Sequence, residues 1–199
     1  MSQDKIDEGR TRGFLEEIGF EVKEFSKEER KKASTPDFRI LKNKGLIFFC
    51  EVKTIAEDNW LYKIVSAAPE ETIVGGSRND PRFNRISAKI HDAVSQFRSV
   101  NPDHKYPNVL VFMSHDKYCR YGSLLQTIRG DFFAQSGEHH PIFLKYSEGR
   151  IKEEKFEIDL FIWFDNLQEE PYWLFGKNEE HFLNLCKYFD KNPWAIKSA

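Results

Sequence analysis

The chain has 199 residues, 40% hydrophobic and 31% charged, a composition that predicts a folded globular domain and excludes a disordered chain. Its formal net charge of −2 excludes a broadly basic protein, so any surface that binds a polyanion must be a local patch. The 18 phenylalanines predict an aromatic-rich core.

Targeting and membrane signals are missing from the sequence as it stands. No apolar run approaches the roughly 18 residues of a membrane span, and the stretch "MSQDKIDEGR" lacks the apolar segment of a signal peptide. Cys50, Cys119 and Cys186 are far apart and outside any C-x-x-C spacing, which argues against disulfides and a zinc knuckle. We therefore expect one cytoplasmic domain over residues 1–199, without a membrane partner.

The first predicted element is a helix over residues 6–18, which Gly19 ends. Residues 20–26 alternate between apolar and charged side chains, which predicts a half-buried strand. Residues 27–34 form a polar connector. The expected apolar side of the helix consists of Ile6, Phe14, Leu15 and Ile18.

The middle of the chain predicts two strands, a loop and a helix. The strands cover residues 37–41 and 46–53 and are joined by a tight turn. Residues 55–80 contain Gly75-Gly76-Ser77, which indicates a mobile loop. Asp80-Pro81 then supplies an N-cap and a first-turn proline for a helix. Its apolar residues recur at helical spacing: Phe83, Ile86, Ile90, Val94 and Phe97.

Strands dominate the remainder of the predicted structure. The helix ends at Asn101-Pro102, and a buried strand follows at residues 108–114. In the C-terminal third we expect strands at 142–146 and 156–164, then an amphipathic helix at 179–189. The order of helix, three strands, helix and strand predicts an α/β domain with one central sheet.

Two charges stand at the end of one of the most apolar strands. Glu51 and Lys53 share a face with Ile47 and Phe49, because residues two apart on a strand point the same way. The other face is apolar as well, which is typical of a central strand covered on both sides. Burying an unpaired charge there would cost several kcal/mol. The alternative is a Glu51–Lys53 pair that reaches solvent at the strand end.

The turn before this strand predicts which residue lies opposite Glu51. Asn43-Lys44-Gly45 fits a three-residue loop with glycine in the left-handed position. That loop pairs Asp37 directly with Glu51, at a Cβ separation of about 5 Å. Two carboxylates this close repel unless a divalent cation bridges them, so we predict a metal site. A two-residue loop would move Asp37 to the opposite face.

These residues resemble the PD-(D/E)XK nuclease superfamily. Pro36-Asp37 is followed, after thirteen residues, by Glu51-Val52-Lys53. The segment "EGRTRGFLEEIGFEV" is similar to the opening helix of archaeal Holliday-junction resolvases, in which a glutamate precedes the helix-ending glycine by about the distance of Glu8 from Gly19. Glu21-Val22-Lys23 also fits E-x-K, but no P-D hairpin precedes it.

The resemblance implies a restriction-endonuclease-like αβββαβ core over about residues 6–115. This core has a central mixed sheet flanked by helices, with strand and helix additions over about 116–199. It also implies a nuclease, most often a DNA endonuclease, that hydrolyses phosphodiester bonds with Mg²⁺, for which Mn²⁺ can substitute. Because both strands of a duplex must be cut, it further implies that the chain can form a homodimer.

The roles of the site residues also come from the resemblance. Asp37, Glu51 and the backbone carbonyl of Val52 would hold Mg²⁺, a cation that prefers oxygen ligands. Lys53 would position the attacking water and offset charge on the phosphorane. Glu8 would bind metal through water or support a second ion.

A basic stripe lies beside the apolar face of the helix that starts near residue 80. At about 100° per residue, its members fall within one narrow sector. They are candidate nucleic-acid-binding residues: Arg78, Arg82, Arg85, Lys89 and Gln96. Aligned cations would hold phosphates and make binding salt-sensitive. A merely solvated face is an equally good interpretation of this stripe.

Two alternatives to a nuclease stay open at the level of sequence. The chain could be a nuclease-like fold that binds nucleic acid or a protein without cutting. It could also be an unrelated α/β module whose charged strand end is accidental, in which case Asp37 and Glu51 would lie on opposite faces or far apart. The sequence leaves DNA and RNA undistinguished.

Overall fold

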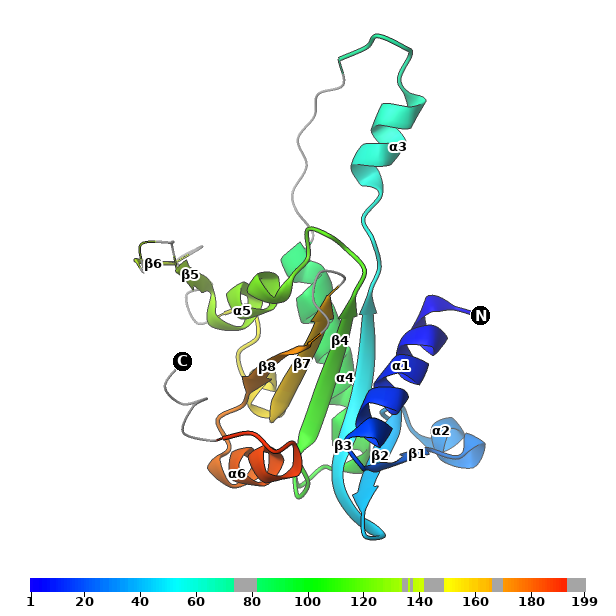
Figure 1. The fold of residues 1–199 in the computed structure, drawn as a ribbon, viewed down its shortest axis with the longest axis vertical. Coiled ribbons are helices and arrows are strands. Elements are labelled where there is room, and N and C mark those ends of the chain that lie inside the picture. Colours follow the sequence, from blue (N-terminus) through cyan, green and yellow to red (C-terminus); the bar gives the residue numbers. More distant parts are fainter. Residues whose placement is uncertain (74–81, 134–135, 137, 142–148, 166–169, 193–199) are drawn as a thin grey trace.

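The computed structural model describes the chain except for residues 74–81, 134–135, 137, 142–148, 166–169 and 193–199. It is an α/β structure built on one six-stranded mixed sheet with strand order β1-β2-β3-β4-β7-β8 (Figure 1). The sheet strands are β1 (Glu21–Glu24), β2 (Phe38–Lys42), β3 (Gly45–Ile55), β4 (Asn108–Ser114), β7 (Leu160–Asp165) and β8 (Tyr172–Phe175). Two short strands, β5 (Asp131–Phe133) and β6 (His139–Pro141), form a separate antiparallel pair.

The helices are α1 (Gln3–Glu17), α2 (Lys27–Lys32), α3 (Trp60–Ala67), α4 (Arg82–Val100), α5 (Tyr121–Arg129) and α6 (Glu179–Tyr188), with a 3₁₀ turn at Glu154–Phe156. The first three strands pair antiparallel, β3, β4 and β7 run parallel, and β8 returns antiparallel to β7. Parallel neighbours need crossover connections, and α3 with α4 and then α5 supply them. None of the helices in the described part of the chain is long and apolar enough to cross a membrane.

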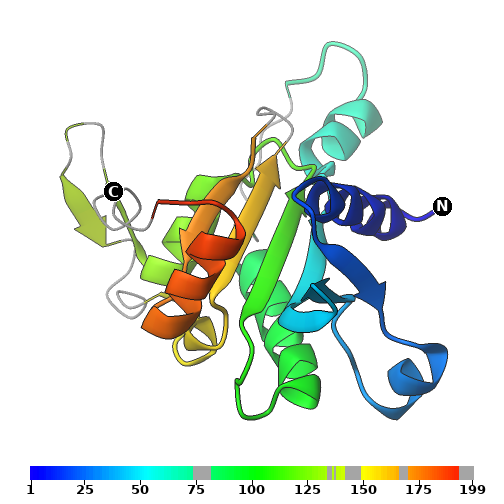
Figure 2. The ribbon, with the colours of Figure 1, turned by 60° about the horizontal axis from the view of Figure 1, so that its bottom comes forward.

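Both faces of the sheet are covered, as expected for parallel strands at its centre. Helix α4 packs on one face, where Ile90 and Phe97 meet Phe112 and Trp163. Helices α1 and α6 cover the other face, which Figures 1 and 2 show on the side opposite α4. The predicted α4 and β4 are confirmed, and α6 lies within one residue of its predicted range.

The buried side of α1 differs in part from the prediction, in which Leu15 was correctly placed. Ile6 and Ile18 are 38% and 36% exposed, whereas Asp7, Thr11 and Leu15 are buried. These three lie at i, i+4 and i+8, one stripe of a helix. The stripe turns inward because Asp7 finds polar partners beneath it: Thr54 Oγ1 donates to its carboxylate at 2.6 Å, and His115 Nε2 lies 2.9 Å away.

The predicted connector at 27–34 is wrong, because it contains α2. Ser26 and Glu29 form a reciprocal capping box, which satisfies two amides at the helix start without burying any of its residues. The predicted strand at 156–164 is wrong in its first half: the 3₁₀ turn ends at Phe156 and β7 begins at Leu160. The predicted strand at 142–146 lies outside the described residues.

Helix α3 occupies part of the predicted loop at 55–80. Figure 1 shows it standing away from the sheet, beyond the end of β3. Tyr62 and Val65 are exposed on it. Residues 75–77, on which the prediction of mobility rested, lie outside the described part of the chain.

Candidate functional site

The hairpin that leads into the site has a two-residue turn, so the predicted three-residue loop is wrong. Lys42 pairs with Gly45, and the two turn residues Asn43 and Lys44 have φ of 52° and 65°. Two left-handed residues in succession are the mark of a type I′ hairpin. The glycine lies outside the turn, in the first position of β3.

A β-bulge restores the register that the shorter turn would have lost. Leu41 pairs with Leu46 and Ile40 with Phe48, which leaves Ile47 as the extra residue. The bulge places Ile47 on the same face as Phe48, among the residues under α1, and Leu46 packs on the α4 side. The prediction that Ile47 shares a face with Phe49 and Glu51 is therefore wrong. From Phe48 onward the predicted register holds, and Phe38 pairs with Cys50.

Asp37 and Glu51 consequently lie side by side, just where β2 begins. The Asp37 amide donates to Glu51 Oε2 at 2.9 Å, and the Val52 amide donates to Asp37 Oδ2 at 2.9 Å. Glu51 is 2% exposed, whereas Asp37 is half-buried. The two carboxylates thus converge, as the sequence predicted, and are not on opposite faces.

Lys53 joins this pair from the same face of β3. Its ammonium lies 2.7 Å from Glu51 Oε1, donates to Gln96 Oε1 at 2.8 Å and forms an ion pair with Asp92. Gln96 in turn donates to the carbonyl of Thr35 at 3.1 Å, next to the P-D motif. Helix α4 therefore holds the lysine in place through one amide and one carboxylate.

The buried charges shift one another's protonation. Burial raises the pKa of Glu51 to about 8, and the charge of Asp37 adds to this shift against the opposing effect of Lys53. Burial also raises the pKa of Asp37, with a contribution from Glu8. Burial lowers the pKa of Lys53, but its pairing with Glu51 and Asp92 outweighs this effect, so that the pKa is raised overall. The lysine is thus a permanent cation beside two carboxylates that repel each other.

Glu8 approaches the site from α1. Its negative charge raises the pKa of Asp37, so it lies within electrostatic reach of that carboxylate. Lys5 pairs with Glu8 at 2.5 Å. The hydrogen bond from Thr54 to Asp7 fastens the neighbouring turn of α1 to β3, directly after Lys53. The structure thus brings Glu8, the fourth candidate site residue, within electrostatic range of Asp37, while its ion pair is with Lys5.

The carbonyl of Val52 faces the same open edge. In a strand, the N–H and C=O of one residue point to the same side. Because the Val52 amide donates to Asp37, its carbonyl also points to the β2 side, past the last ladder pair of β2 with β3. Oxygen atoms that could bind a metal are thus directed to one edge of β3 from three residues: Asp37, Glu51 and Val52.

The residues of the predicted basic stripe on α4 differ in their contacts. The arginines bind other groups of the chain, whereas the lysine forms no ion pair among the described residues. Arg85 Nη2 lies 2.5 Å from buried Asp116 and its Nη1 donates to the Ala56 carbonyl at 2.9 Å. Arg82 donates to the Tyr118 carbonyl at 3.0 Å. Lys89 is half-buried and forms no ion pair among the described residues, and Arg78 lies outside them.

Sequence reasoning missed Asp92, the acidic partner of Lys53. It stands three residues after Lys89 and four before Gln96, so helical spacing alone placed it in the same stripe. Buried Asp116 and Asp7 were missed as well. Asp116 lies in the turn two residues after β4, and nothing in its local sequence distinguishes it from a solvent-exposed turn acid.

The chain matches no protein-family model, no curated protein and no solved structure. Its function is therefore inferred from its own residues and their geometry.

Proposed function

We propose that this chain is a metal-dependent nuclease that hydrolyses phosphodiester bonds in DNA. The observation that carries the proposal is the convergence of Asp37, Glu51 and Lys53 on one face at the edge of β3, with the pKa of Glu51 raised to about 8. Carboxylates and a cation that perturb one another in this way are typical of catalytic sites.

The order of elements supports membership of the PD-(D/E)XK superfamily. Helix α1, the antiparallel strands β1, β2 and β3, helix α4 and the parallel strand β4 follow the αβββαβ order that the resemblance implies. Helices α2 and α3 are insertions into that order. The pairing of β4 with β7 adds a further central strand from the C-terminal third.

The donor set fits Mg²⁺ or Mn²⁺. Asp37, Glu51 and the Val52 carbonyl offer only oxygen, which hard divalent cations prefer. Burial raises the pKa of Glu51, and repulsion from Asp37 adds to this shift; a cation between the two carboxylates would offset both effects. When bound, such an ion polarises the scissile phosphate and lowers the pKa of a coordinated water.

Lys53 is suited to stabilise charge rather than to remove a proton. Its pKa is raised, so it stays an ammonium at neutral pH and cannot act as a general base. Held by Gln96 and Asp92, it orients the attacking water and offsets the negative charge that grows on the phosphorane. Glu8 would act through a water or support a second ion.

The choice of DNA, the formation of a homodimer and a cytoplasmic location stay predictions from the resemblance and the sequence. Cutting both strands of a duplex in one binding event would need two copies of this site. Among the described residues, Lys89 of the basic stripe forms no ion pair, so it could contact a phosphate without breaking one.

A second candidate is a nuclease-like module that binds nucleic acid or protein without cutting. It is favoured by the ion pair between Lys53 and Asp92, and by Arg82 and Arg85, which are bound to the chain's own carbonyl and carboxylate groups. In this module the charges would fasten α4 to the sheet.

Cleavage assays separate the two candidates. The purified chain is incubated with Mg²⁺ or Mn²⁺ on linear, circular, single-stranded and branched DNA, and on RNA. We expect Asp37→Asn and Lys53→Ala each to slow cleavage on the order of 100-fold or more. Matched controls come from the second E-x-K, on β1, where Glu21 and Lys23 form an exposed ion pair at 2.9 Å: Glu21→Gln and Lys23→Ala should leave the rate unchanged.

Cleavage that persists equally in all four variants would rule out the site. A wild-type chain that binds these substrates but cuts none of them, with either metal, would favour the silent module.

A further inference from the structure

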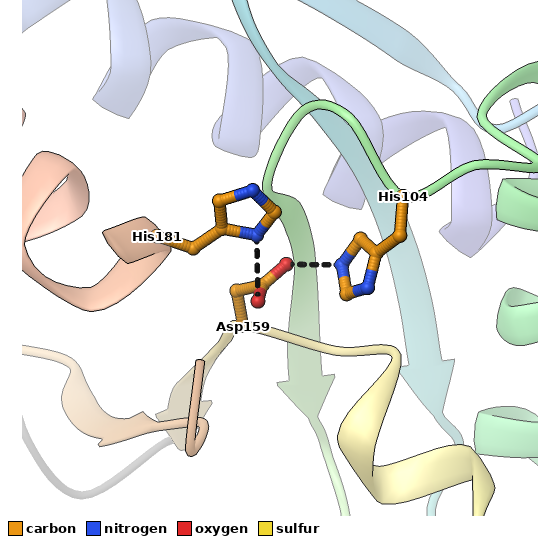
Figure 3. A group of neighbouring side chains, drawn as sticks. All are labelled: His104, Asp159 and His181. Carbon is orange, nitrogen blue, oxygen red and sulfur yellow. Dashed lines mark hydrogen bonds and ion pairs between the residues drawn. The ribbon is translucent and has the colours of Figure 1, made fainter. Parts of the chain in front are cut away.

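A second polar cluster lies at the other end of the central strands, where β4 and β7 begin. It brings together His104 from the turn after α4, Asp159 directly before β7 and His181 from the first turn of α6 (Figure 3). His104 Nε2 is 2.7 Å from Asp159 Oδ2, and His181 Nδ1 is 3.0 Å from Asp159 Oδ1. One nitrogen or oxygen of each residue lies within 4.8 Å of the others.

The carboxylate at the centre of this cluster is desolvated. Asp159 is 1% exposed, and the backbone amide of Asn108 donates to its Oδ2 at 2.8 Å. Within the described residues, neither a lysine nor an arginine pairs with it. A buried carboxylate without a lysine or arginine partner needs another cation or strong hydrogen-bond donors.

The two imidazoles are the hydrogen-bond partners of this carboxylate, and their arrangement around it also suits a metal ion. Each turns one ring nitrogen to a different oxygen of the same carboxylate, and the second nitrogen of each ring has no partner in the described part of the chain. His181 is buried, whereas the side chain of His104 is 24% exposed. The exposed edge of His104 gives an ion a path from solvent.

We propose that His104, Asp159 and His181 bind one zinc ion. Two imidazoles and one carboxylate form a set of three protein ligands that zinc accepts, with water in the fourth position. Ligands of a tetrahedral zinc lie about 3.4 Å apart, given zinc–nitrogen distances of about 2.0 Å. A separation of up to 4.8 Å would close by at most about 1.5 Å, and the contacts of 2.7 and 3.0 Å between the imidazoles and Asp159 would widen by less than about 1 Å. Rotation of the partly exposed His104 ring would supply such a change.

The ion would fasten α6 and the turn after α4 to the beginning of β7. His181 stands at the start of α6, and Leu185 of this helix and Phe189, its C-cap, pack on the sheet face beneath α1 and α6. Zinc that binds only the folded chain raises its thermal stability by mass action. The site shares none of its ligands with the proposed nuclease site.

The competing explanation is a hydrogen-bonded hub, in which both histidines donate a proton to Asp159. Glutamine distinguishes the two cases, because its amide also donates to a carboxylate but is a poor zinc ligand. His104→Gln and His181→Gln thus keep a donor for Asp159 and remove a ligand. His91 on α4, which pairs with Glu154 and is half exposed, provides the matched control His91→Gln.

The experiment uses the full chain carrying Asp37→Asn, which removes one of the two converging carboxylates and so weakens zinc binding at the other site. The protein is stripped with EDTA, equilibrated with micromolar zinc and desalted, and its zinc is counted by mass spectrometry. Thermal melts are recorded with and without zinc. We expect one zinc per chain and a rise in Tm of several degrees. The count should fall at least tenfold in His104→Gln and His181→Gln and stay at one in His91→Gln.

Three outcomes would overturn the proposal: a folded chain that retains no zinc, equal zinc in His181→Gln and His91→Gln, or binding without any rise in Tm. The first concerns the unmutated cluster, so it decides the question even if a glutamine variant fails to fold.

Discussion

The proton on Glu51 makes the stability of the chain depend on pH. Its folded pKa of about 8 lies above the usual 4.5, so between these values the folded state binds more protons than the unfolded state. The free energy of unfolding must then fall as pH rises through this window, by on the order of 3 to 5 kcal/mol from this group. Below pH 4.5 the destabilisation vanishes, and above pH 8 it is complete.

Glu51→Gln should remove that dependence, because an amide does not ionise. Urea unfolding at pH 5 and pH 9, without divalent metal, measures the difference. We expect the wild type to lose more stability than Glu51→Gln between the two values, and Glu51→Gln to be the more stable protein at pH 9. Parallel curves for the two proteins would show that Glu51 ionises normally and that the carboxylate pair is less strained than proposed.

Arg85 and Lys89 occupy the same predicted stripe but should behave differently. Asp116 is buried against Arg85, so Arg85→Ala leaves a buried carboxylate unpaired and should cost about 3 kcal/mol of unfolding free energy. Lys89→Ala should change stability by less than about 0.5 kcal/mol. It should instead weaken DNA binding and lower the slope of log affinity against log salt by about one.

Urea titrations and binding measured at several salt concentrations test both variants. If Arg85→Ala stays fully stable yet loses DNA affinity, Arg85 is a phosphate contact and its pairing with Asp116 is incidental.

These contrasts show which residues local sequence could identify. The alternation of a strand placed Glu51 and Lys53 on one face, and the helical repeat placed Gln96 in the stripe beside them. Which arginine forms the ion pair with Asp116 depends on how the turn after β4 folds back on α4. No spacing rule encodes that contact.

At the scale of elements, the hairpin reached the predicted register by a route that the sequence did not reveal. The turn is one residue shorter than predicted, and the bulge at Ile47 compensates for it. In a type I′ turn the second position favours glycine, but here it is Lys44, with φ of 65°. A side chain in this left-handed conformation costs about 1 kcal/mol.

Lys44→Gly should therefore stabilise the chain by about 0.5 to 1 kcal/mol and leave nuclease activity unchanged, since the register beyond Phe48 is untouched. Urea unfolding measures the gain, and Lys42→Gly, at the ladder position beside the turn, is the control that should destabilise. A loss of stability in Lys44→Gly would contradict the type I′ turn.

Other elements show where periodicity fails for physical reasons. Helix α1 buries Asp7 because polar partners lie beneath it, and Thr11 is buried on the next turn of the same stripe, so the apolar residues of the helix do not mark its inward side. The helix α2 buries nothing and exists through its capping box, a signal that was present at Ser26 and Glu29. Longer elements with continuous apolar patterns, such as α4 and β4, were predicted correctly.

At the scale of the whole molecule, the C-terminal third forms part of the centre of the fold. The resemblance covers residues up to about 115, where β4 would be an edge strand. In the structure, β4 pairs with β7 along its length, from Val109 with Leu160 to Ser114 with Asp165. Trp163 on β7 is fully buried in the core under α4, and Leu185 of α6 in the core on the other face.

A chain shortened to residues 1–115 should consequently fail to fold. It would expose the paired edge of β4 and one side of both cores, and an unpaired apolar edge strand promotes aggregation. Circular dichroism and urea unfolding should show no cooperative transition, whereas the full chain should unfold in one step. A cooperative transition in the shortened chain would mean that the nuclease-like core is autonomous and the later strands are an addition.

Substitutions at Trp163 test the same point in the full chain. Its indole Nε1 is buried and has no hydrogen-bond partner within the described residues, so Trp163→Phe loses no hydrogen bond there and should cost less than about 1.5 kcal/mol. Trp163→Ala opens a cavity beside Phe112, whose ring centre is 5.2 Å away, and should cost about 3 to 5 kcal/mol. Equal, small losses of unfolding free energy in both variants would place Trp163 in a part of the molecule that opens independently of the central sheet. A cavity lowers the free energy of global unfolding only when its side chain belongs to the cooperative core.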